Sequence, residues 1–169
     1  VEKYGTDAVR YYLLREIPSG EDGDFSLEKF KERFNGDLAN GLGNFAARVL
    51  TLAHNADLRI NAEDADKLVD DIVSQKIEEV KNLVQQKLDE FKIHEALADL
   101  WGLIHFGDQY VNEKKPWDKN VAESDKRLAI YNALVTLDNV AALLLPFLPE
   151  TAEKITKSIN WEGYKLSVK

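Results

Sequence analysis

The sequence contains no cysteine and no methionine among its 169 residues, and it has only three histidines. Without cysteine the chain can form no disulfide, thiolate metal site or cysteine nucleophile. Because His54, His94 and His105 are dispersed along the chain, we expect no zinc or iron site built on paired imidazoles. Even position 1 lacks methionine, and Val1 opens a segment that already has a structured pattern. This predicts that the chain is a piece of a longer protein.

Long apolar runs and an excess of positive charge are also lacking. We find no apolar run long enough to span a bilayer and no leader of the secretory type, so we expect neither a membrane span nor a secretory signal. The net charge of −8 argues against bulk nucleic-acid binding, which depends on neutralising phosphates. The acidity is concentrated in residues 61–90, which hold nine acidic and four basic side chains. A nucleic-acid site elsewhere would therefore have to be local and specific.

Apolar residues recur at helical spacing through nearly the whole chain, and no segment shows a convincing strand pattern. Thr6, Ser26 and Ser124 are expected N-caps, and Pro116 is expected to end a helix by pushing Lys115 towards an extended conformation. The pattern predicts an all-α bundle of four long amphipathic helices after a short leading one. The expected helices cover approximately residues 7–16, 26–52, 65–91, 93–113, 124–145 and 149–159.

Three glycines interrupt the second expected helix, at Gly36, Gly41 and Gly43. Each lowers helix stability by up to about 1 kcal/mol relative to alanine. The usual reason for such a cost is close approach to another backbone or to a ligand, which we therefore expect along this segment.

Motifs of catalysis are missing. There is no Gly-x-Ser-x-Gly elbow, no phosphate-binding glycine loop and no His-Glu-x-x-His helix. The segment "NGLGNF" at 40–45 neither follows a strand nor matches a nucleotide fingerprint. Carboxylate pairs such as Asp70 and Asp71 are typical of a solvated helix face. By itself the chain is not expected to be an enzyme.

Asn44 and Arg48 are four residues apart on an expected helix, hence neighbours on one face beside the apolar stripe. An ordinary surface pair is the simple interpretation. A binding role is favoured by the weak helix propensity of asparagine, by the approachable backbone at Gly43, and by the chemistry of the pair. An amide and a guanidinium together form the donor and acceptor set that reads base edges.

Trp117 follows Lys115 and Pro116 in a run of mixed charge, "VNEKKPWDKN". The ring either folds back into the core beneath a proline-shaped turn or remains exposed as a platform on which an unpaired base stacks. The pattern alone leaves both interpretations open. Trp101, by contrast, lies within a helical apolar stripe and is expected to be structural.

Four segments resemble class I methionyl-tRNA synthetases and occur in the same order. "YGTDAVRYYLLREIPSGEDGDFS" resembles the segment after the catalytic lysine-rich loop, and "RFNGDLANGLGNFAAR" resembles the first helix of the anticodon-binding bundle. "NEKKPW" resembles the loop with the anticodon-stacking tryptophan, and "LLLPFLPETAEKI" resembles a later helix junction. The resemblance covers residues 1 to about 157. The pair Asn44 and Arg48 together with Lys-Pro-Trp points to the methionine enzyme among its sister synthetases.

The resemblance implies a role for each matched residue. Trp117 would stack on the first anticodon base, and Asn44 and Arg48 would hydrogen-bond to bases of the CAU triplet. Asn40 and Pro116 match positions beside that site. The implied partners are initiator and elongator methionine tRNA and the catalytic domain of the same cytoplasmic protein, a ligase that would use ATP and Mg²⁺. This chain has neither that domain nor its signatures, so we expect no ATP, metal or other cofactor site in it.

The resemblance also divides the chain into three parts. Residues 1–25 would end the stem-contact or linker region, residues 26–160 would form the anticodon-binding bundle, and residues 161–169 would be a C-terminal tail. The aromatic residues of the tail itself, Trp161 and Tyr164, suggest that it docks through them. Two alternatives stay open from the residues themselves. One is the same bundle from a sister synthetase for leucine, isoleucine, valine or cysteine, and the other is a helical protein-interaction bundle with no RNA role.

Overall fold

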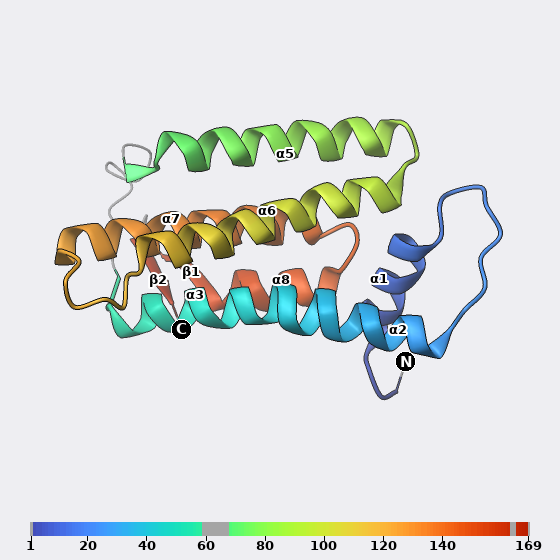
Figure 1. Cartoon of the computed structure of the whole chain (residues 1–169), viewed down its shortest axis with the longest axis horizontal. Helices are drawn as coiled ribbons and strands as arrows, with labels where there is room; N and C mark the ends of the chain where they lie inside the picture. The colour runs from blue at the N-terminus through green and yellow to red at the C-terminus, as the bar shows by residue number, and fades with distance from the viewer. Residues whose placement is uncertain (1, 59–67, 163–164, 169) are drawn as a thin grey trace.

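Helices make up most of the computed structural model, which describes residues 2–58, 68–162 and 165–168 (Figure 1). Helices α2 and α3 are joined by a π-helical segment, η1, so that the three run on as one long rod (Figure 1). The expected all-α bundle is confirmed, with one short hairpin added to it. The elements are α1 (Thr6–Glu16), α2 (Leu27–Arg33), η1 (Phe34–Gly43), α3 (Asn44–Asn55), α5 (Asp71–Asp89), α6 (Ile93–Lys114), α7 (Glu123–Leu144), α8 (Pro149–Ser158), β1 (Ile159–Glu162) and β2 (Lys165–Val168).

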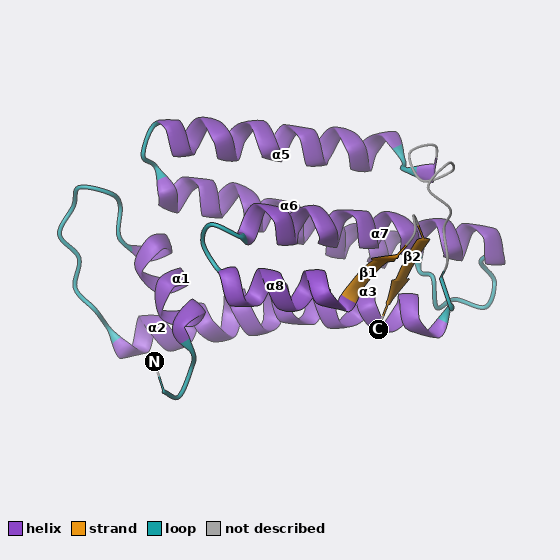
Figure 2. Ribbon diagram, turned by 180° about the vertical axis from the view of Figure 1, so that it is seen from behind, coloured by secondary structure: helices purple, strands orange, loops and turns teal. Residues whose placement is uncertain are grey.

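Helix α7 lies at the centre of the bundle and packs against α3, α5, α6 and α8 (Figure 2). Its leucines Leu134, Leu137 and Leu144 are fully buried. Within the described residues α7 is also the one helix long and apolar enough to cross a membrane, with a mean hydropathy of 1.2 over its most apolar window. Since 61% of that window is buried inside the protein, its apolar character is explained by its place in the core.

The leading helix α1 is attached to the junction between α7 and α8. The Arg10 guanidinium donates to the carbonyl oxygens of Phe147 at 2.8 Å and Pro146 at 3.1 Å. The buried Asp7 carboxylate accepts a hydrogen bond from the Thr151 amide at 2.7 Å. That amide lies in the first turn of α8, where helix N–H groups lack partners within the helix. Asp7 of α1 therefore caps α8, although the two residues are 144 positions apart in the sequence.

Of the expected capping and helix-end residues, Ser26 is correct and Thr6, Ser124 and Lys115 are wrong. Ser26 caps α2 by accepting from the Lys29 amide. Thr6 is not an N-cap, because the cap position falls on Gly5, whose φ of 82° suits only glycine. Ser124 lies inside the first turn of α7, since the extended cap residue is Ala122. Lys115 is left-handed rather than extended, with φ 46° and ψ 57°, and its amide still bonds to the last turn of α6.

Two further expectations need correction. The helix expected at residues 65–91 begins at Asp71, although residues 65–67 themselves lie outside the described part of the chain. The tail was expected to contain no strand, yet β1 and β2 pair antiparallel, with Ile159 opposite Val168, and β2 contacts α3. The expected docking through the Trp161 side chain and Tyr164 falls outside what the structure describes.

Candidate functional site

A cavity of about 400 Å³ opens between the long α2–η1–α3 rod and helix α6. The rod contributes the polar side chains of Asn40, Asn44 and Arg48 to one wall. Two amides and a guanidinium beside apolar surface can both hydrogen-bond to a planar ligand and pack against it. The full lining is Asn40, Gly41, Asn44, Arg48, Trp101, Ile104, His105 and Asp108.

The rod reaches this cavity through η1, a π-helix of ten residues. A π-helix is wider than an α-helix and recurs at functional sites. Two of its three glycines have atoms close to where a side chain would begin. A Cβ on Gly41 would lie 3.4 Å from Trp101 Nε1, and a Cβ on Gly43 would lie 3.0 Å from the carbonyl oxygen of Leu38. At Gly41 the neighbour outside η1 is the Trp101 side chain at an ordinary contact distance, at Gly43 it is the backbone of η1 itself, and Gly36 faces open space. The expected close approach to another backbone is therefore not found at these three positions.

Arg48 is held at the cavity rim by two side chains of α6. Its Nη1 donates to Asp108 Oδ1 at 2.9 Å, and its Nη2 donates to Asn112 Oδ1 at 2.7 Å. Asn112 Nδ2 in turn donates to Asp108 Oδ2 at 3.1 Å, which closes a ring of three hydrogen bonds. This ring joins α3 to the last turns of α6 and fixes the direction of the guanidinium.

Trp117 lies over the same guanidinium. The Arg48 Cζ atom is 4.6 Å from the centroid of the indole ring, within cation–π range. The ring is 49% exposed, while the preceding Pro116 is buried. The left-handed Lys115 and a tight turn, in which the Asp118 amide donates to the Lys115 carbonyl at 2.8 Å, project the ring from the end of α6. Trp117 is thus a partly exposed ring and not a core plug.

The structure brings the candidate residues together. Asn40, Asn44 and Arg48 line the cavity, Trp117 joins them through Arg48, and Pro116, the residue before the ring, is buried. Sequence reasoning missed the opposite wall on α6 and treated Trp101 as purely structural. That wall has a signal in the sequence, because its members repeat at helical spacing on one face of α6. They are Trp101, Ile104, His105 and Asp108.

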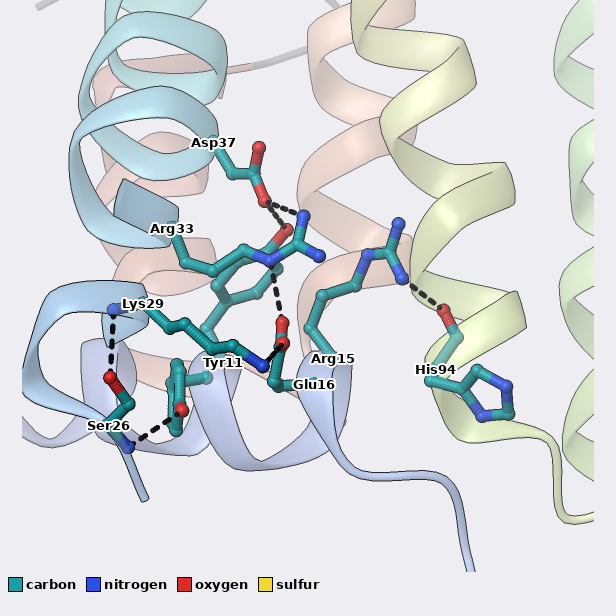
Figure 3. A network of polar contacts seen from close by, with 9 residues as sticks. Tyr11, Arg15, Glu16, Ser26, Lys29, Arg33, Asp37 and His94 are labelled. Carbon is teal, nitrogen blue, oxygen red and sulfur yellow. Dashed lines mark hydrogen bonds and ion pairs between the residues drawn. The ribbon is translucent and has the colours of Figure 1, made fainter. Parts of the chain in front are cut away.

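Behind the cavity, a polar network secures η1 to α1 (Figure 3). The Asp37 carboxylate accepts from the Tyr11 hydroxyl at 2.7 Å and from Arg33 at 3.2 Å, and Arg33 also binds Glu16 at 3.0 Å. The hydrogen bond from Arg33 lowers the pKa of Glu16 below its ordinary value. Burial opposes the charge on Arg33, but its two carboxylate partners outweigh burial and raise its pKa. Burial, reinforced by Asp37, raises the pKa of Tyr11 far above neutrality, so this hydroxyl acts as a donor.

Trp101 connects that network to the cavity. Its indole Nε1 donates to the Asp37 carbonyl oxygen at 3.2 Å, and its ring lies 4.5 Å from the ring of Tyr11. The same indole lines the cavity beside Gly41. The π-helical wall is therefore fixed both to α1 and to α6. Over the described part of the chain, no three His, Asp or Glu side chains gather in a way that could hold a metal ion.

Comparison with known families finds two matches along the chain. Residues 1–50 match the family described as tRNA synthetases class I (M), and residues 70–168 match the anticodon-binding domain of tRNA ligase. The second match covers more than half of the 169 residues. Both walls of the cavity are represented, since the first match contains Asn44 and Arg48 and the second contains α6 and Trp117.

Individual relatives are methionine–tRNA ligases. The chain is 34% identical to that of Thermotoga maritima and 40% identical to that of Clostridium acetobutylicum, over 96% of its own length in each case. It spans only 26% of either relative. Among solved structures, Mycobacterium tuberculosis methionyl-tRNA synthetase in complex with methionyl-adenylate superimposes with a TM-score of 0.80 and 34% identity, covering 93% of this chain and 32% of that one.

Proposed function

Because the chain belongs to the anticodon-binding domain family of tRNA ligases, in its methionyl-tRNA synthetase branch, we propose that it reads the CAU anticodon of methionine tRNA. The observation that carries the proposal is the meeting of Asn44, Arg48 and Trp117 around one cavity. Asn44 and Arg48 come from α3, whereas Trp117 comes from the loop after α6. Packing of the bundle does not by itself require a cation beside a half-exposed ring.

The chemistry of the site suits unpaired bases. Anticodon bases splay out of their loop when bound and are recognised by stacking and by hydrogen bonds to their edges. Trp117 offers an exposed ring on which the first anticodon base stacks. Asn44 and Arg48 offer an amide and guanidinium donors to the following bases, with Asn40 and Pro116 beside them. Such reading needs few phosphate contacts, which agrees with a chain of net charge −8.

The wider protein enters the proposal as well. The chain spans about a quarter of its curated relatives, so activation of methionine with ATP and Mg²⁺ would take place in a catalytic domain outside this chain. The relative from M. tuberculosis holds methionyl-adenylate, the product of that step. In a protein of this kind the bundle would present the anticodon of initiator and elongator methionine tRNA in the cytoplasm, while the catalytic domain receives the acceptor end.

The test is a titration of the chain with an anticodon stem-loop that carries CAU, followed by tryptophan fluorescence. A stem-loop with a scrambled triplet is the control ligand. We expect tighter binding of CAU, and we expect Trp117→Ala to lose about 1–3 kcal/mol of binding, the usual contribution of one stacked base. Arg48→Ala should relax the preference among bases more than it changes the salt dependence.

A matched control is available in Phe91, which is 76% exposed at the turn between α5 and α6, at the opposite end of α6 from Trp117. Phe91→Ala removes an exposed aromatic ring without touching the cavity, so it should leave RNA binding unchanged. Equal binding of the CAU and scrambled loops by the unmodified chain would refute the proposal. Equal losses for Trp117→Ala and Phe91→Ala would refute the stacking role.

A further inference from the structure

Arg48 has more hydrogen-bonding capacity than its partners on α6 use. A guanidinium carries five N–H donors, and the contacts with Asp108 and Asn112 occupy two of them. No other described residue accepts a hydrogen bond from the remaining donors while the group is held between those partners and Trp117. Arg48 can therefore keep its contacts with α6 and still donate to a base in the cavity.

Asp108 is an unexpected neighbour for an RNA ligand. Its carboxylate lies on the cavity wall with 43% of the side chain exposed, where it repels phosphates. Within the ring of hydrogen bonds, Asp108 Oδ1 accepts from Arg48 and Asp108 Oδ2 accepts from Asn112. Both carboxylate oxygens are therefore already engaged with the group that holds the guanidinium. An arginine without these contacts would have to lose the freedom of its long side chain each time RNA binds.

We propose that Asp108 and Asn112 are positioning residues of the anticodon site, which hold the Arg48 guanidinium against Trp117 before RNA arrives. This inference rests on the proposed function of the cavity. The two residues act through Arg48 and not by contacting bases themselves. They fix the direction of the N–H donors of the Arg48 guanidinium. They therefore contribute to discrimination among anticodons and not to the general attraction of RNA.

The experiment is a double-mutant cycle on the 169-residue chain. The ratio of the dissociation constants for scrambled and CAU stem-loops is measured for the unmodified chain, Asp108→Asn, Arg48→Ala and the double variant. We expect Asp108→Asn to lower this ratio by about two- to fivefold, the range of a partly exposed ion pair. In the Arg48→Ala background the same change should have no further effect. Asn112→Ala should act in the same direction.

The matched control is Glu113→Gln, which removes one negative charge from the exposed face of the same helix turn. Glu113→Gln should leave the discrimination ratio unchanged. Glu113→Gln and Asp108→Asn each remove one negative charge, so each should raise the affinity for the scrambled loop through weaker repulsion. If the unmodified chain distinguishes the two stem-loops, a ratio that does not fall in Asp108→Asn overturns the proposal. A fall of equal size in the Arg48→Ala background also overturns it, because Asp108 would then act on RNA directly.

A second measurement needs no RNA. The mobility of the Arg48 Nε–H group, followed by NMR relaxation, should be low in the unmodified chain and in Glu113→Gln, and clearly higher in Asp108→Asn. Equal mobility in all three overturns the positioning role. If the unmodified chain does not distinguish the two stem-loops but the Arg48 group loosens as expected, the proposed function fails while the positioning role stands.

Discussion

Two glycines on α6 lie five residues apart and should respond to alanine in opposite directions. A Cβ on Gly102 would meet nothing within 4 Å. A Cβ on Gly107 would lie 2.9 Å from Phe45 Cε2 and 3.1 Å from Thr136 Cγ2, with Phe45 Cζ closer still. Both neighbours are only 1% exposed, so neither can swing into solvent to make room. Gly107 therefore sets the distance at which α3, α6 and α7 pack.

The magnitudes follow from these surroundings. Replacing a helical glycine by alanine stabilises an unhindered site by about 0.5–1 kcal/mol, which we expect for Gly102→Ala. At Gly107 the same gain is outweighed by overpacking, which typically costs about 1–3 kcal/mol. Because the gain is common to both sites, the free energies of unfolding of the two variants should differ by the overpacking cost, roughly 1–3 kcal/mol in favour of Gly102→Ala, before any backbone relaxation.

Urea denaturation followed by circular dichroism measures this difference directly, with the unmodified chain as reference. The pair is its own control, since the chemical change, the helix and the loss of glycine flexibility are the same at both sites. Gly107→Ala as stable as Gly102→Ala would refute the reasoning, because α3 would then not approach α6 as closely as the structure has it. A shift of α3 would also separate Arg48 from Asp108, which bridge the same two helices.

Three further changes follow from local contacts. Asn132, fully buried, binds the Asp70 amide at 2.8 Å and two carbonyl oxygens, so Asn132→Ala should lower the free energy of unfolding by about 2–4 kcal/mol in urea. Glu16→Gln should cost about 1 kcal/mol at neutral pH. Because Arg33 lowers the Glu16 pKa below its ordinary 4.5, this difference should be constant above that pH and vanish as pH falls through the lowered value; a pH-independent difference would contradict the pairing. Phe91 is exposed after α5 and has a left-handed φ of 58°, which strains any residue with a Cβ. Phe91→Gly should therefore raise the free energy of unfolding by about 1 kcal/mol, seen as a higher Tm, and a lower Tm would contradict this backbone strain.

The sequence by itself determined the helices, because helical periodicity and most stop signals are local. Leu134, Leu137 and Leu144 repeat at the spacing that buries one face, and proline ends α6 and α7 close to where expected. Conformations that depend on the surroundings were mispredicted. Lys115 is left-handed and Ser124 lies inside its helix, since the entry and exit of a helix depend on neighbouring turns as well as on residue type.

The hairpin and the π-helix depended on tertiary contacts. Strands β1 and β2 are four residues each, too short for a clear alternating pattern, and they are stabilised by each other and by α3. The sequence of Phe34–Gly43 predicts an ordinary α-helix interrupted by glycines. Its π-helical form goes together with the tertiary contacts that Trp101 and Tyr11 make with Asp37.

For the site, residue types and resemblance named one wall, and packing supplied the other. Local chemistry singled out Asn44, Arg48 and Trp117 as candidates, and Asn40 and Pro116 were added by the resemblance alone. Only the tertiary structure placed Asp108 and Asn112 against Arg48, because these contacts join residues about 60 positions apart in the chain. The same packing decided the question that the pattern left open, since the loop geometry after α6 leaves the ring of Trp117 half exposed above Arg48 instead of burying it.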